Sequence, residues 1–298
     1  MISSLYQNAA ALSGLVIWYG LFVLLERRER FHWFRPLLPL LAGYVSFRAL
    51  GWYLVALHPA IVPHLEHLAG GRRLLLFIND VGLREEGIKL LFAMPCLGWL
   101  LSRPAPPSAL TTAALVGLGF ATAENRWFFG GHAEPTLLVG RVFSTTALHV
   151  AATGLCGGVL SQVWQHRPRV WARFWATFLT VVVAHGLYDW PPGSAWAWLQ
   201  AGSTSWPCQM VVIALVAWFF ILLHRTQPVR THLRAALVWF ALSATVQYAL
   251  ALGITWVHWR SLETVWICAR ECLLFLPAVL FTVLFFATRS SKQNLSKK

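Results

Sequence analysis

Four segments place carboxylates, imidazoles or amides inside otherwise apolar runs of this 298-residue sequence. Glu85 and Lys89 are four residues apart, as are His185 and Asp189, so each pair shares one face of a helix. In order, the segments read Glu85-Glu86-Gly-Ile-Lys89, Phe120-Ala-Thr-Ala-Glu124-Asn125, His149 after Thr145-Thr146, and His185-Gly-Leu-Tyr-Asp189. Ionisable residues at membrane depth usually mark function, so we expect them to form one site.

These residue types are suited to activating water. A carboxylate shielded in a helix bundle can accept a proton from water, and a histidine can donate one to a leaving group. An amide such as Asn125 could donate a hydrogen bond to an oxyanion. The predicted catalytic residues are Glu85, Glu86, His185, Glu124 and His149, and the predicted supporting residues are Lys89, Asn125 and Asp189.

The same donors leave a metal site open as an alternative. Zinc in hydrolases takes histidine and carboxylate ligands and keeps one position for water. The alternative ligands are Glu86, Glu124, His149 and His185. The sequence contains neither HExxH nor GxSxG, which excludes two common protease signatures. A second histidine cluster, His58, His64 and His67 with Glu66, is interpreted as an outer loop.

The composition predicts an all-α, polytopic integral membrane protein. Hydrophobic residues make up 57% of the chain and charged residues 12%, whereas soluble domains carry roughly a quarter charged residues. The net charge of +13 is explained by basic cytoplasmic loops, so no nucleic-acid partner is expected. None of the five cysteines belongs to a CxxC pair, so we expect no disulfide framework.

About nine runs are long enough to span a hydrocarbon core of roughly 30 Å. They lie near residues 9–25, 36–57, 74–101, 110–129, 136–160, 171–190, 207–224, 233–257 and 264–287. The third run is too long for one perpendicular helix, since its residues would extend about 42 Å at 1.5 Å each. We therefore expect a break or an interfacial stretch near Asn79 to Gly82.

Loop charges predict the orientation. The loops after the first, third, fifth and seventh spans and the C-terminal tail hold 15 Lys and Arg residues, and the opposite loops hold three. This asymmetry places the N-terminus outside and the C-terminus in the cytoplasm. The expected organisation is one integral membrane domain over 1–298, with a catalytic core at 74–190 and flanking scaffold spans at 1–73 and 191–298. Counted along these spans, the polar groups fall between the midplane and the outer surface.

In that order and in successive spans, the four segments resemble the motifs of the PrsW family of intramembrane proteases, relatives of the CAAX-prenyl proteases and bacteriocin-processing enzymes. The resemblance covers about residues 80–190. The CAAX-prenyl relatives carry Arg one residue further after the glutamate pair, whereas this chain has Ile88-Lys89-Leu90, which favours the PrsW branch.

The resemblance implies a glutamate-dependent endopeptidase in a bacterial cytoplasmic membrane. Its substrate would be a single-span, membrane-anchored protein such as an anti-sigma factor, cut on the extracytoplasmic side of the bilayer. It also implies that Glu85, Glu86 and His185 are essential. On this resemblance we favour a metal-free mechanism without a cofactor, with zinc as the alternative.

Other interpretations of these residues stay open. A proton-coupled transporter or channel could use the buried charges as a relay, and a non-catalytic relative could act as a membrane scaffold. Each motif also has a purely structural explanation. In these structural explanations, Glu85 and Glu86 pair with Lys89 or Arg84, and Glu124 pairs with Arg126. His149 bonds to Thr145, and Asp80 pairs with Arg48.

Overall fold

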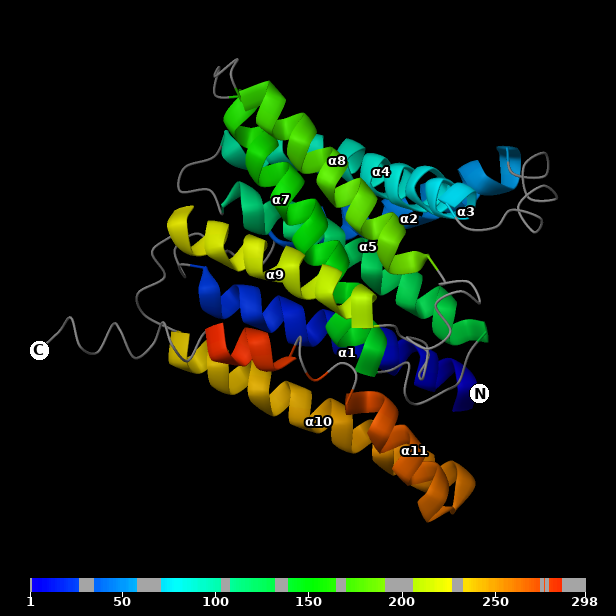
Figure 1. Cartoon of the computed structure of the whole chain (residues 1–298). Coiled ribbons are helices and arrows are strands. Elements are labelled where there is room, and N and C mark those ends of the chain that lie inside the picture. The colour runs from blue at the N-terminus through cyan, green and yellow to red at the C-terminus, as the bar shows by residue number, and fades with distance from the viewer. Residues whose placement is uncertain are drawn as a thin grey trace, which may run out of the picture.

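The structure is a computed structural model. It describes residues 2–26, 35–57, 71–102, 108–131, 139–164, 170–190, 206–226, 233–273, 276 and 279–285. Within these ranges every assigned element is helical, which confirms the all-α fold class. Most of the long helices run side by side in one bundle (Figure 1).

Ten α-helices and two π-helical stretches are assigned in these ranges. They are α1 (Ile2–Leu25), α2 (Leu37–Leu57), α3 (Gly71–Leu76), η3 (Phe77–Leu83), α4 (Arg84–Leu101), α5 (Ala109–Gly131), η4 (Arg141–Thr145), α7 (Thr146–Trp164), α8 (Val170–Asp189), α9 (Trp206–Thr226), α10 (Leu233–Trp259) and α11 (Leu262–Cys272).

Among the described residues, four helical segments are long and apolar enough to cross a membrane. They are Arg141–Trp164, Val170–Asp189, Cys208–Thr226 and Arg234–Val257, and they correspond to the fifth to eighth predicted spans. The chain is thus a multi-pass membrane protein by the length and composition of its helices. The full set of nine spans and the orientation of the termini stay predictions.

The described residues cover only part of the predicted ninth span, 264–287. Helix α11 covers Leu262–Cys272, and residues 276 and 279–285 are also helical. The ninth span therefore stays a prediction. A sharp turn at Arg260, whose φ is 52°, folds α11 against the end of α10 (Figure 1).

The centre of the bundle is formed by α5 and α7. Helix α5 packs against α1, α2, α4 and α7, and every residue of α7 except Gln162 and Trp164 is buried. At their crossing, a Cβ on Gly117 would overlap the carbonyl oxygen of His149. This glycine therefore lets the two backbones touch, which brings α5 side chains within reach of His149.

Candidate active site

In place of the break or interfacial stretch expected near Asn79 to Gly82, the structure has a π-helical stretch, η3. Stretch η3 joins α3 to α4 without a break, and π-helical turns are frequent at functional sites. It packs against α8 at two glycines. A Cβ on Gly82 would overlap the carbonyl oxygen of Val182, and a Cβ on Gly186 would lie 2.5 Å from the Cα of Ile78. This backbone contact brings the first turn of α4 up to His185.

Glu86 lies at the centre of the charged cluster. Its Oε1 is 2.6 Å from Nζ of Lys89 and 2.6 Å from Nδ1 of His185. All three residues are at most 2% exposed. A buried charge is tolerated only when it is paired and hydrogen-bonded, so the two contacts account for the carboxylate at this depth.

The network continues from Lys89 to His149 and Glu124. Nζ of Lys89 lies 2.8 Å from Nδ1 of His149. Because an ammonium group can only donate, Nδ1 is the acceptor in this contact. The proton of the neutral ring then resides on Nε2, which donates to Oε2 of Glu124 at 2.6 Å. The hydrogen bonds thus fix both the tautomer and the orientation of the ring.

Arg141, the first residue of η4, closes the far side of the network. Its Nη2 lies 2.6 Å from Oε1 of Glu124, and its Nε donates to Oδ1 of Asn125 at 2.6 Å. The amide nitrogen of Asn125 donates to Oγ1 of Thr146 at 3.1 Å. The amide of Asn125 thus accepts from Arg141 and donates to Thr146, and its role as an oxyanion donor stays a prediction.

Glu85 and Asp189 flank the other ring nitrogen of His185. His185 Nε2 lies 3.1 Å from Oδ2 of Asp189 and 3.6 Å from Oε2 of Glu85. That Glu85 oxygen is also 3.6 Å from Nζ of Lys89. It is buried and has no hydrogen-bond partner among the residues that the structure describes. Glu85 thus keeps a buried acceptor that takes no hydrogen bond from the described residues.

The structure brings all eight predicted site residues into one connected network. Helix α4 contributes Glu85, Glu86 and Lys89, α5 contributes Glu124 and Asn125, α7 contributes His149, and α8 contributes His185 and Asp189. The side chains of Glu85, Glu124 and Asp189 are 15%, 18% and 32% exposed, whereas Lys89, His149 and His185 are buried. These three carboxylates are therefore partly accessible to solvent, while the rest of the charged groups are buried. The catalytic roles of these residues stay predictions.

Some of the structural alternatives take other partners. Asp80 pairs with Arg84 at 2.9 Å, and Nη1 of Arg126 donates to the Tyr44 hydroxyl at 2.9 Å. The Thr145 hydroxyl contacts Tyr188 at 2.8 Å, while His149 is held by Lys89 and Glu124 as described above. The histidines of the second cluster, 58, 64 and 67, lie outside the described residues.

Arg141 is the site residue that sequence reasoning missed. A charged residue at membrane depth was the available signal, but its partners, Glu124 and Asn125, lie on another helix. The Phe120 ring was a second missed contribution. Its centroid lies 4.4 Å from Nζ of Lys89, which adds a cation–π contact to the buried ammonium.

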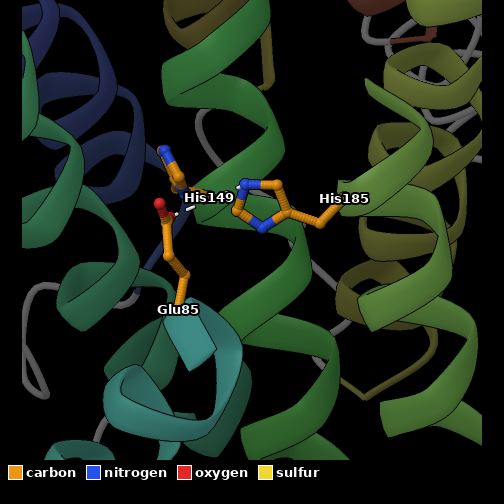
Figure 2. A group of neighbouring side chains, drawn as sticks. All are labelled: Glu85, His149 and His185. Atoms are coloured by element: carbon orange, nitrogen blue, oxygen red, sulfur yellow. Dashed lines mark ion pairs between the residues drawn. The ribbon is translucent and has the colours of Figure 1, made fainter. Parts of the chain in front are cut away.

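A metal-binding group can be drawn in this network, although it differs from the predicted set. Ligand atoms of Glu85, His149 and His185 all lie within 4.8 Å of one another, and these side chains converge from three helices (Figure 2). Two imidazoles and one carboxylate are the donors of many hydrolytic zinc sites. In the predicted set, Glu86 and Glu124 stood in place of Glu85, and both are engaged by cationic side chains.

The ammonium group of Lys89 lies next to two of these three donors. It is 2.8 Å from Nδ1 of His149 and 3.6 Å from Oε2 of Glu85. A divalent ion among the donors would lie beside this positive charge. The donor types therefore fit zinc, but the arrangement does not fit it while the Lys89 ammonium holds its place.

Comparison with known proteins gives one match. The family model described as PrsW family intramembrane metalloprotease matches residues 36–223, which includes all four motifs. No curated protein and no solved structure matches the chain. Because the family match covers more than half of the sequence, this chain belongs to the PrsW family of intramembrane proteases.

Proposed function

We propose that this protein hydrolyses a peptide bond of a membrane-anchored substrate, with Glu85 as the group that activates water. The observation that carries the proposal is that the buried Oε2 of Glu85 accepts no hydrogen bond from the described residues. No described residue donates a hydrogen bond to it, and it faces the two imidazoles of His149 and His185. A water molecule bound at this oxygen would gain the acceptor that a general base must offer.

Glu86 has a different task in this proposal. Its Oε1 already accepts from Lys89 and His185 at 2.6 Å each, so it is committed to holding both cationic groups in place. We therefore assign the base to Glu85 and the positioning of Lys89 and His185 to Glu86. The sequence left this choice open because it does not fix the rotation of the helix.

The chemistry can be written as a balanced hydrolysis. Glu85 removes a proton from water as the water oxygen attacks the scissile carbonyl carbon. Collapse of the tetrahedral intermediate breaks the C–N bond, and the leaving amine takes a proton from Nε2 of His185, which Asp189 orients from 3.1 Å. The proton on Glu85 then restores His185 over their 3.6 Å separation, directly or through water.

The substrate and its membrane setting are part of the proposal. Membership of an intramembrane protease family supports a membrane protein as substrate. We propose a single-span protein such as an anti-sigma factor, cut near the extracytoplasmic side of a bacterial cytoplasmic membrane. The 15 basic residues on the predicted cytoplasmic side support this orientation.

The zinc alternative concerns the same residues. If zinc were bound, Glu85, His149 and His185 would hold it, and it would supply Lewis-acid polarisation and a more acidic water. The Lys89 ammonium among these donors favours the metal-free form.

The test uses purified protein in liposomes with a panel of single-span reporter proteins. We expect Glu85→Gln to abolish cleavage while the protein unfolds as wild type does. Glu86→Gln should also destabilise the fold by about 3–5 kcal/mol, because the buried Lys89 loses its closest ion-pair partner. The matched control is Asp80→Asn, which removes a nearby carboxylate that pairs with Arg84 outside the network; it should cut as wild type does.

A chelator completes the experiment. Metal-free hydrolysis predicts that cleavage persists when zinc is chelated. Cleavage that stops on chelation and returns with zinc would reject the metal-free mechanism and keep the protease. Full cleavage by Glu85→Gln would reject Glu85 as the base. If no reporter is cut by wild type, the assignment fails in favour of a transporter or a scaffold, and solute flux is measured next.

A further inference from the structure

Lys89 is the most deeply buried charged group of the network. Its side chain has no exposed surface, and three groups surround its ammonium. Nζ lies 2.6 Å from Glu86 Oε1, 2.8 Å from His149 Nδ1 and 3.6 Å from Glu85 Oε2. The aromatic face of Phe120, with its centroid 4.4 Å away, covers another side. Two carboxylates, an imidazole and a ring face make this a site built for a cation.

The same donors would serve a metal ion. Glu85 and His149 belong both to the metal-binding group and to the surroundings of the Lys89 ammonium. The lone pair of His149 Nδ1 can accept one hydrogen bond or one metal bond, but not both. A divalent ion bound to these donors would also lie within a few ångströms of a unit positive charge, in surroundings that screen charges weakly.

We propose that the Lys89 ammonium is the resident cation of this site, and that it and a divalent metal ion exclude each other. This inference rests on the proposed metal-free function and extends it. The wild-type chain binds zinc weakly at Glu85, His149 and His185, and removing the Lys89 charge converts the same three residues into a zinc site.

The inference also assigns a task to Lys89 in the reaction. Of its three N–H groups, one donates to Glu86 and one to His149. On the side of Glu85, Oε2 lies 3.6 Å from Nζ, beyond hydrogen-bond range, so the third N–H group could donate to a substrate atom bound there. A scissile carbonyl there would face a fixed positive charge, which is the stabilisation that a metal supplies in other hydrolases.

The test measures zinc binding, with no need for a substrate. Wild type, Lys89→Met and Lys89→Arg are purified in detergent, stripped with chelator and titrated with zinc, and bound metal is counted by elemental analysis. We expect Lys89→Met to bind one zinc per chain at least about tenfold more tightly than wild type, because the competing charge is gone. Lys89→Arg keeps the charge and should bind as weakly as wild type.

Two controls keep the result specific. Adding His149→Ala to Lys89→Met should remove the gained zinc, which ties binding to the proposed ligands. If Lys89→Met does not fold because Glu86 loses its partner, the double variant Lys89→Met with Glu86→Gln removes both charges of that pair and is titrated instead. The absorption of Co²⁺ bound in place of zinc reports the coordination geometry independently.

The inference is overturned if wild type binds zinc as tightly as Lys89→Met, or if neither charge-removing variant gains zinc. Its failure is separable from failure of the proposed function. Reporter cleavage that depends on Glu85, together with no gain of zinc in the charge-removing variants, would reject the inference but support the proposed protease function. Gained zinc in Lys89→Met, together with no cleavage by wild type, would do the reverse.

Discussion

Replacing Gly186 with alanine should push α8, which carries His185, away from η3 and α4, which carry Glu86. Gly186 follows His185 on α8, and a Cβ at this position would lie 2.5 Å from Cα and 2.7 Å from N of Ile78 in η3. Both are backbone atoms, so no side chain can rotate away. Ordinary contact begins near 3.4 Å, and the two segments must therefore separate by about 0.9 Å.

This separation would lengthen the contact between Glu86 and His185. Residues 78 and 86 belong to one continuous helical run, and residues 185 and 186 are neighbours. A shift of about 0.9 Å would stretch the 2.6 Å contact between Glu86 Oε1 and His185 Nδ1 to about 3.5 Å, beyond hydrogen-bond range. A misplacement of about 1 Å can lower the rate roughly 10²-fold, or about 2.7 kcal/mol of barrier. Overpacking adds about 1–3 kcal/mol of destabilisation.

The assay compares initial rates of reporter cleavage in liposomes with unfolding in denaturant. The matched control is Gly87→Ala, in the first turn of α4 beside Glu86. A Cβ there meets no described atom within 4 Å, so this variant should cut at the wild-type rate and gain up to about 1 kcal/mol of helix stability. Wild-type cleavage by Gly186→Ala, or equal loss in both variants, would refute the packing argument.

Two further predictions follow from other contacts. Arg141→Gln should lower kcat at least about tenfold, because Glu124 and His149 lose their orientation. Arg141→Lys should restore only part of the wild-type kcat, since one ammonium replaces a guanidinium that contacts both Glu124 and Asn125. Equal kcat in both variants would contradict a role for the guanidinium. Arg260→Gly should raise the free energy of unfolding by about 1 kcal/mol, because Arg260 pays the steric cost of a φ of 52°. Arg270→Gly, inside α11, should lower it by about 1 kcal/mol in the same denaturant titration, and stabilisation of both would point to a cause other than the turn.

Much of the candidate site could be predicted from helical spacing and depth. Glu85 and Lys89 fall on one helix face and lie 3.6 Å apart, although Lys89 lies closer to Glu86, at 2.6 Å. The four motifs lie in α4, α5, α7 and α8, and the structure joins them into one network. This worked because a charge in an apolar helix must find a partner, and the motifs hold few candidates for each other.

Spacing could not choose among partners on different helices. Asn125 is a plausible oxyanion donor by residue type, and only the structure shows that its amide contacts Arg141 and Thr146. Glu85 and Glu86 are adjacent in sequence and equivalent in type. Only their surroundings separate them, since Glu86 Oε1 accepts from Lys89 and His185 and Glu85 Oε2 accepts no hydrogen bond from the described residues.

The sequence alone determined that this is a multi-pass helical membrane protein of the PrsW family, because apolar length and motif order are properties of the chain itself. The tertiary structure decided which atoms meet. Backbone contacts at Gly117, Gly82 and Gly186 set how closely the helices approach, and that approach placed the Lys89 ammonium among the donors that a metal would need. Such contacts depend on helix rotation and crossing, which are fixed by packing over the whole bundle.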